Sequence, residues 1–273
     1  MSSFILKNGK FVAADEKLFQ YSDFETLLFS EKIRAIRNVF PFFEETVDLL
    51  LLKFRLLNQA VPDILSVNGR ELKRQSERLL TKNKLFKSAV VQLSFFRNGD
   101  DTGYIFSARS MDSTGFELNK KGLLVEVFDK MAKPVSELSC LSFGSDALWK
   151  IASGYLHGSD SDEFLIINSE GKIIEGIGRK LFMIKGDQLY GVSPSAGAYM
   201  DVAGSLVAPV AEKAGLAYSE CNGFTSDQIL QADELFFLDA VRGAQWILGF
   251  REKRFYNVKT RLINEELYRF KCL

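Results

Sequence analysis

The stretch from Glu163 to Pro194, EFLIINSEGKIIEGIGRKLFMIKGDQLYGVSP, decides the fold that this sequence predicts. It holds four short runs rich in β-branched and aromatic residues: Phe164 to Asn168, Lys172 to Glu175, Leu181 to Lys185 and Leu189 to Val192. The turn-forming residues Ser169-Glu170-Gly171 and Gly186-Asp187 lie between them, a pattern typical of antiparallel hairpins. We therefore predict a meander of four strands, with the carboxylate of Glu175 at the end of one of them.

The N-terminal part of the chain predicts helices packed on an antiparallel sheet. The expected elements are a hairpin over Phe4 to Val12, strands over Glu25 to Phe29 and, after a Ser30-Glu31-Lys32 turn, Ile33 to Val39, helices over Phe42 to Asn58 and Gly69 to Asn83, and strands over Lys87 to Arg97 and Tyr104 to Ala108. Arg109 to Asn119 has the polar and glycine content of a connection between domains. We expect an α+β protein with an N-terminal domain over 1–108, a linker over 109–119 and a C-terminal domain over 120–273.

The C-terminal domain adds several elements to the meander. They are a strand over Gly122 to Phe128, helices over Asp146 to Leu156 and Asp201 to Ala214, a short helix capped by Thr225 or Ser226, a strand over Glu234 to Leu238, a hairpin of Gln245 to Phe250 with Phe255 to Asn257, and a helix over Thr260 to Phe270. Pro209 lies too deep in its segment for an uninterrupted helix, so we expect a kink or a later helix start there.

Composition limits the classes of partner. The 273 residues are 47% hydrophobic and 26% charged with zero formal net charge, which is typical of soluble globular proteins. Zero net charge gives no long-range attraction for nucleic acid, and no apolar run approaches the ~20 residues that span a bilayer. The N-terminus shows no signal-peptide pattern. We expect a cytoplasmic protein without a membrane or nucleic-acid partner.

Few residues point to metal or nucleophilic chemistry. The three widely spaced cysteines, Cys140, Cys221 and Cys272, predict neither a disulfide framework nor a metal site. The lone histidine, His157, is expected at a helix end, and Gly176-Ile177-Gly178 lacks the third glycine of a dinucleotide fingerprint. The 24 phenylalanines predict either a Phe-rich core or an exposed aromatic patch for a partner.

Four strings spread over nearly the whole chain resemble one enzyme family. They are Ser22-Asp23-Phe24-Glu25-Thr26, the segment Asp162 to Phe182, Ser193-Pro194 followed by Asp201 to Gly215, and Gln231-Ala232-Asp233-Glu234-Leu235-Phe236 followed by Val241-Arg242-Gly243. Together they are similar to the motifs of the fold-type IV PLP-dependent enzymes. These class IV aminotransferases include branched-chain aminotransferase, D-amino-acid aminotransferase and aminodeoxychorismate lyase.

The resemblance implies a two-domain, D-amino-acid-aminotransferase-like fold, with a smaller N-terminal α/β sandwich and a larger C-terminal domain that has a β-barrel-like core. It also implies pyridoxal 5′-phosphate (PLP) as cofactor, a homodimer, and a small amino-acid-like or carboxylate ligand. In such a site a carboxylate faces the pyridine nitrogen of PLP, and Glu175 takes that position. Arg242 and Gly243 lie where a second phosphate loop is expected, so they are the other candidate cofactor-binding residues.

The Schiff-base lysine of the family is absent from its place. Counted back from Glu175, its slot falls at Leu141-Ser142, and the nearest lysines to Ser142 are Lys133 and Lys150. Lys180 lies beyond Glu175, where the family carries Asn. The candidates for a relocated lysine are therefore Lys150 and Lys180.

The phosphate anchors also differ. Leu49 stands at the position of the family's arginine on the first long helix. Asp201-Val202-Ala203-Gly204 stands in place of its Gly-Ile-Thr-Arg turn. At an effective dielectric of ~20, the carboxylate of Asp201 at ~4 Å would repel one phosphate charge by about 4 kcal/mol.

These matches and departures give three hypotheses. The first is a class IV aminotransferase or aminodeoxychorismate-lyase-like protein with a degenerate PLP site and reduced or no transaminase activity. The second is an active PLP-dependent aminotransferase or lyase that uses Lys150 or Lys180. The third is a non-catalytic binding or scaffolding dimer.

Overall fold

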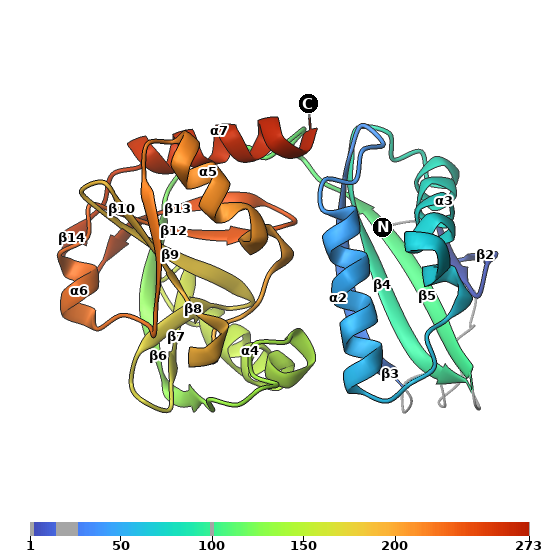
Figure 1. The fold of residues 1–273 in the computed structure, drawn as a ribbon, viewed down its shortest axis with the longest axis horizontal. Helices are drawn as coiled ribbons and strands as arrows, with labels where there is room; N and C mark the ends of the chain where they lie inside the picture. The colour runs from blue at the N-terminus through green and yellow to red at the C-terminus, as the bar shows by residue number, and fades with distance from the viewer. Residues whose placement is uncertain (1–2, 15–26, 99–100, 273) are drawn as a thin grey trace. The chain divides into compact units, whose positions relative to one another are not determined.

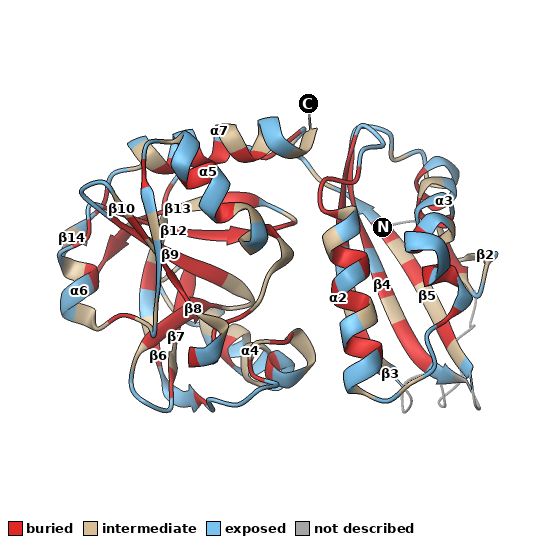
Figure 2. Cartoon of the chain, in the orientation of Figure 1, coloured by how far each residue is buried: buried red, intermediate tan, exposed pale blue. Residues whose placement is uncertain are grey.

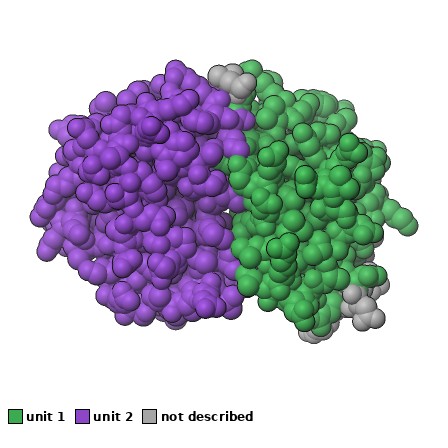
Figure 3. Space-filling view, in the orientation of Figure 1, with its two compact units in different colours: residues 1–115, 272 green, residues 116–271, 273 purple. Residues whose placement is uncertain are grey.

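The computed structural model describes residues 3–14, 27–98 and 101–272 (Figure 1). The chain divides into two compact units, Met1–Gly115 and Phe116–Lys271, which Figure 3 shows in green and purple. The linker expected over 109–119 remains a prediction. The string Ser22 to Thr26, which carried part of the resemblance, lies outside the described residues.

The first unit is a sheet covered by helices. Its strands pair in the order β2-β1-β5-β4-β3, with bounds β1 Phe4–Lys7, β2 Lys10–Ala13, β3 Leu27–Ile36, β4 Ser88–Asn98 and β5 Asp101–Ser110. Its helices are α2 Phe43–Leu56, η1 Asp63–Leu65 and α3 Ser66–Lys82. Phe54 of α2 packs edge-on against Phe29 and Phe95, with ring centroids 5.0 and 5.2 Å away, so aromatic contacts hold α2 to the sheet.

The prediction of a turn at Ser30-Glu31-Lys32 is wrong. These residues continue β3 and pair with Gln92, Leu93 and Ser94 of β4. The Oγ atoms of Ser30 and Ser94 lie 2.9 Å apart across the pair. β3 is the edge strand of its sheet, where polar side chains are tolerated because one side faces solvent.

The second unit is built around a closed barrel. Its strands are β6 Leu123–Lys133, β7 Glu163–Asn168, β8 Ile173–Gly176, β9 Arg179–Lys185, β10 Gln188–Val192, β11 Ala217–Cys221, β12 Glu234–Asp239, β13 Gly243–Phe250 and β14 Lys253–Arg254. Within the described residues, β9-β12-β13-β6-β7-β8 close through a β8–β9 pairing. Strands β7 to β10 pair antiparallel in chain order, which confirms the predicted meander. β11, which adds in parallel to β10, was not expected.

Helices and short turns cover the barrel. They are α4 Ser142–Leu156, η2 Pro194–Ala196, η3 Val202–Leu206, α5 Val207–Lys213, α6 Ser226–Leu230 and α7 Val258–Cys272. The segment around Pro209 begins as a 3-10 helix and becomes α-helical only at Val207, as the proline predicted. Thr225 and Gln228 form a capping box at the start of α6.

The phenylalanines belong mostly to the two cores. Figure 2 shows the barrel strands largely in the colour of buried residues. In the described part of the chain, Phe86 and Phe270 are the phenylalanines with exposed side chains. Of the two alternatives, the Phe-rich core is therefore confirmed, and the described residues do not form the exposed aromatic patch. None of the described helices is both long and apolar enough to cross a membrane.

Candidate functional site

Lys133 reaches the centre of the candidate site because β6 bulges. Val125 to Phe128 pair in parallel with Glu163 to Ile166 of β7, and the ladder resumes at Lys133, opposite Asn168. Residues 129–132 between these pairs are exposed, whereas Lys133 is 1% exposed. A bulge re-aims the side chain that follows it, and here it directs an ammonium group into the protein.

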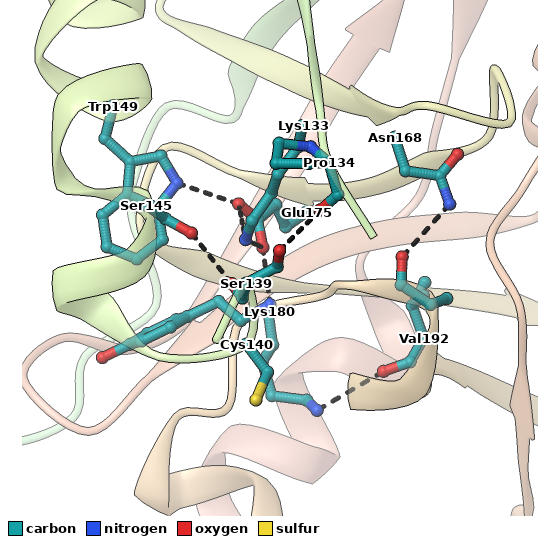
Figure 4. A network of polar contacts seen from close by, with 12 residues as sticks. Lys133, Pro134, Ser139, Cys140, Ser145, Trp149, Asn168, Glu175, Lys180 and Val192 are labelled. Atoms are coloured by element: carbon teal, nitrogen blue, oxygen red, sulfur yellow. Dashed lines mark hydrogen bonds and ion pairs between the residues drawn. The ribbon is translucent and has the colours of Figure 1, made fainter. Parts of the chain in front are cut away.

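Glu175 of β8 lies at the centre of a buried polar cluster (Figure 4). Each of its carboxylate oxygens lies 2.8 Å from Lys133 Nζ. Trp149 Nε1 donates a further hydrogen bond to Oε1 at 2.8 Å, and the backbone N–H of Tyr199 donates one to Oε2 at 2.5 Å. A carboxylate has about four lone-pair positions, so donors of this chain fill all of them.

The cluster lies outside the barrel and beneath covering segments. Ile174 and Leu181 belong to the barrel core, so Glu175 and Lys180, which lie opposite each other in β8 and β9, point outward together. The Trp149 ring covers the cluster, with its centroid 5.3 Å from the Lys133 ammonium. This distance permits a cation–π interaction, which adds to the ion pair.

Burial and pairing shift the pKa values of Glu175 and Lys133 in opposite directions. Burial raises the pKa of the Glu175 carboxyl and lowers the pKa of the Lys133 ammonium, while their mutual attraction and hydrogen bonds oppose both shifts. The three groups that approach the Glu175 carboxylate are all hydrogen-bond donors, which favours the ionised carboxylate over a protonated one.

In two turns of the second unit, aspartate carboxylates accept hydrogen bonds from backbone N–H groups. Asp201 Oδ1 accepts hydrogen bonds from Ala203 N at 2.8 Å and from Ala240 N at 2.9 Å, and so joins η3 to the turn after β12. Asp239 Oδ1 accepts hydrogen bonds from the amides of residues 241–242 at 2.9 and 2.8 Å. In the sequence these turns resemble the family's phosphate loops, and in the structure a carboxylate of the chain binds amides of each turn.

Lys180 of β9 lies beside Glu175 but extends away from it, toward the carbonyl oxygen of Val192 (Figure 4). It is 6% exposed, and its Nζ atom lies 3.5 Å from that oxygen. Among the described residues no carboxylate forms an ion pair with it. Burial lowers the pKa of Lys180, and the negative charges of Glu220 and Asp201 oppose that shift.

The second lysine candidate and the vacant lysine slot lie in different surroundings. Lys150 is on the outer side of α4, where its side chain is 75% exposed and its Nζ atom lies 2.6 Å from Asp146. Ser142 is the first residue of α4 and is half-buried. Of the two predicted lysine candidates, only Lys180 adjoins Glu175.

The loop after β12 holds the remaining two candidates. The Arg242 side chain is 46% exposed and lies 3.4 Å from Asp239. Gly243 has a φ of +77°, and a Cβ atom there would lie 2.9 Å from the Cβ of Phe116. Gly243 is therefore required by the backbone and by close packing, which is a structural role.

One depression of the second unit lies away from Glu175. It has a volume of about 700 Å³ and is lined by residues of β6, β7 and the β13–β14 hairpin, together with short segments nearby. Lys133, Glu175 and Arg242 do not line this depression, and neither do the other candidate residues. Glu175 thus faces packed side chains and not this opening.

Comparison with known proteins places the fold. No family model matches the sequence, and no curated protein matches it. Solved structures match across nearly the whole chain. Branched-chain aminotransferase from Thermoproteus uzoniensis with norvaline has 15% identity, covers 97% of this chain and 94% of its own, and has a TM-score of 0.80. This chain has the class IV aminotransferase fold.

Two further structures support that assignment. The Escherichia coli branched-chain amino acid aminotransferase has 18% identity and a TM-score of 0.78, with 96% of this chain and 92% of its own covered. The Thermobaculum terrenum enzyme in its PLP form has 16% identity and a TM-score of 0.79, with 98% and 95% covered. The predicted fold, with a smaller sandwich and a larger barrel-containing domain, is confirmed.

Within the class IV aminotransferase fold, sequence reasoning missed Lys133 and Trp149 as partners of Glu175. Lys133 lies 42 residues before Glu175, and Trp149 lies 26 residues before it. Neither residue belongs to a motif. The sequence feature that could have pointed to Lys133 is its place directly before Pro134, at the end of a strand pattern. The bulge in β6 shifts which side chains face the interior, so simple alternation along the strand does not predict that Lys133 is buried.

Proposed function

We propose that this chain is a class IV aminotransferase-like protein with a degenerate cofactor site, which holds no PLP there and has reduced or no transaminase activity. The observation that carries this proposal is the complete occupation of the Glu175 carboxylate by four hydrogen bonds from three donor groups of the chain. A protonated pyridine nitrogen would need one of those acceptor positions. It would also have to displace a buried ammonium group.

The phosphate end supports the same proposal. The amides of Ala203 and Ala240 hold the Asp201 carboxylate, so a phosphate would have to displace it from them. At ~4 Å and an effective dielectric of ~20, the displaced carboxylate would still repel one phosphate charge by about 4 kcal/mol.

A Schiff-base lysine is absent from the family's slot, and the nearest amine to Glu175 is already paired with it. Ser142 offers no amine, and the Lys133 amine is used by Glu175. The residues present therefore do not fit PLP, and we derive no catalytic step through it.

An absorbance experiment tests the proposal. The purified chain is incubated with excess PLP, passed through a desalting column and scanned, with the Escherichia coli branched-chain aminotransferase as a positive control. We expect no retained PLP band in this chain. A retained band, with a pyridoxyl group on one lysine after borohydride reduction, would overturn the proposal.

The second candidate is an active PLP-dependent aminotransferase or lyase that uses Lys180. Its support is the burial of Lys180 next to Glu175, in contrast to the exposed Lys150. Lys180→Met and Lys150→Met, assayed for amino-acid half-reactions, separate the two lysines. Transaminase activity that is lost only in Lys180→Met would establish this candidate.

The third candidate is a non-catalytic binding or scaffolding homodimer, with a small amino-acid-like or carboxylate ligand, in the cytoplasm. It rests on the family resemblance. Analytical ultracentrifugation over a wide concentration range tests the dimer, and a species with the mass of one chain at every concentration would contradict it.

A further inference from the structure

A depression of about 700 Å³ opens where strand β13 ends beside β6. β13 pairs in parallel with β6 only as far as Phe250 and Val125, and the chain then turns at residues 251–252 into β14. Among the described residues, no strand pairs with β6 on this side beyond Val125. Residues 126–129 of β6 therefore form a free edge, whose backbone N–H and C=O groups can pair with an added strand.

The floor of the depression is apolar. Val125, Ile173 and Phe250 belong to the barrel core and are 1 to 2% exposed, while Val127 and Ile167 are half-buried and pack against that core. The volume is in the range of small-ligand sites, roughly 300 to 1,000 Å³. Apolar side chains of a ligand can therefore extend the core at this surface.

Charged side chains of both signs line the rim. Arg251 and Arg254 come from the β13–β14 hairpin, whereas Glu126 and Asp129 come from β6 and Asp160 from the loop before β7. In the described part of the chain, no ion pair joins either arginine to one of these carboxylates. An anion alone would meet the carboxylates, and a cation alone would meet the arginines. The rim therefore fits a ligand that carries one charge of each sign.

The hairpin holds its two arginines in place. Arg251 has a φ of +52°, an uncommon value for a residue other than glycine, and its guanidinium lies 5.1 Å from the centroid of the Phe250 ring. Arg254 Nη1 donates hydrogen bonds to the carbonyl oxygens of residues 251 and 253 at 2.9 and 3.2 Å. A guanidinium has five N–H donors, and the others of both arginines have no acceptor among the described residues. They are available to a ligand carboxylate.

The spacing of the charged groups sets the length of the ligand. Asp129 lies four residues beyond Val125, which pairs with Phe250, and at about 3.3 Å per strand residue this is about 13 Å. Val125, Val127 and Asp129 are alternate residues of one strand, so the carboxylate and the apolar floor share a face. One amino acid carries both of its charges on a single carbon and cannot reach both ends. An extended peptide of three or four residues spans about 10 to 13 Å and can.

We propose that this depression binds a short apolar peptide with free ends, three or four residues long, extended along the free edge of β6. Its carboxylate lies toward Arg251 and Arg254 and its ammonium toward Asp129, so the peptide runs antiparallel to β6. Asp129 pairs with Lys130 at 3.1 Å, but the two side chains are 74% and 58% exposed, and such a pair is weak enough for the ligand ammonium to replace. This proposal goes beyond the proposed loss of PLP binding, because Glu175 does not line the depression.

Calorimetric titration with the peptide Val-Ile-Val-Ala tests the proposal, since β-branched residues favour an extended chain. We expect saturable binding to the native chain with a Kd below about 1 mM. Acetylation of the peptide's N-terminus or amidation of its C-terminus should each weaken binding about tenfold, because each removes one charge. Free valine should bind more weakly than the peptide. Absence of saturable binding, or equal affinity for the capped peptides or for valine, overturns the proposal.

Two variants assign the ends of the peptide. Asp129→Asn should weaken binding of the free peptide about tenfold and leave binding of the N-acetylated peptide unchanged. Arg251→Asn should weaken binding of the free peptide by a similar factor and leave binding of the C-amidated peptide unchanged; asparagine tolerates a positive φ, so the turn is kept. Equal losses for the free and capped peptides in both variants overturn the proposal.

Controls separate this site from general effects. Arg261→Gln removes an exposed charge of α7 outside the depression and should not change the affinity, and urea denaturation checks that each variant is folded. Peptide binding should slow amide hydrogen exchange at residues 126–129, and unchanged exchange there also overturns the proposal. Peptide binding as expected, together with a retained PLP band, would overturn only the proposed function.

Discussion

Lys133 Nζ lies 2.8 Å from both carboxylate oxygens of Glu175, and the two side chains are 1% and 0% exposed. In our proposal the Lys133 ammonium supplies the positive charge that a protonated pyridine nitrogen supplies in a PLP site. The Asp201 carboxylate likewise occupies amides where a phosphate is expected. In this proposal the chain itself supplies a cation and an anion at the two places where the family resemblance implies the pyridine nitrogen and the phosphate of PLP.

Removing Lys133 tests the strength of the central ion pair. Lys133→Met should lower the free energy of unfolding by about 3 to 5 kcal/mol, because it leaves the buried Glu175 charge uncompensated. Lys150→Met is the matched control and should change it by less than about 1 kcal/mol, since its pair with Asp146 is exposed. Urea denaturation measures both, and the double variant Lys133→Met/Glu175→Leu should recover part of the loss. Similar losses in Lys133→Met and Lys150→Met would refute the pair's importance.

Asp201 should contribute to stability through its amide contacts. Asp201→Ala leaves the amides of Ala203 and Ala240 without this acceptor, and we expect a loss of about 1 to 3 kcal/mol. Asp187→Ala is the control, because Asp187 is exposed and pairs at the surface with Lys259, so a much smaller loss than in Asp201→Ala is expected. The two variants are compared by thermal and urea unfolding. A stable Asp201→Ala variant would show that other groups satisfy these amides.

Gly204 should be required for the position of Lys180. In Gly204→Ala the new Cβ lies 3.0 Å from Lys180 Cδ, and overpacking should cost about 1 kcal/mol. Gly154→Ala on α4 has nothing within 4 Å of its Cβ and should gain about 0.5 to 1 kcal/mol from helix propensity. Adding Lys180→Ala to Gly204→Ala should remove the packing cost. Additive effects of the two substitutions would contradict the contact.

The pH dependence of stability should reveal the buried amine. Burial lowers the pKa of Lys180 below its usual 10.5, so between the lowered value and 10.5 the unfolded chain binds a proton that the folded chain has released. The contribution of Lys180 to the free energy of unfolding therefore rises with pH through that window, by about 1.4 kcal/mol for each unit of depression. Urea denaturation of the native chain and of Lys180→Met at several pH values measures this difference. A difference that stays constant with pH would show that the amine keeps its ordinary pKa.

Local sequence predicted the meander that carries Glu175. Gly171 and Gly186 adopt positive φ values of 73° and 55° in the two turns that their residue type indicated. The start of α4 could not be predicted in this way, because it begins at Ser142 and not at Asp146. Its first turn contains Gly144, a poor helix former whose missing Cβ would lie 2.2 Å from the Leu138 carbonyl oxygen. Packing on the preceding loop therefore fixes this helix start.

The sequence by itself determined the order of the strands in the meander, a helix cap at Thr225 or Ser226 and the place of Glu175 in β8, because each depends on residues adjacent in the chain. Only the tertiary structure decided what faces Glu175. Lys133, Trp149 and Tyr199 come from three separate segments that meet where β6 bulges and α4 covers the barrel. Electrostatic and hydrogen-bond energies depend on distance in space, and the folded barrel sets those distances.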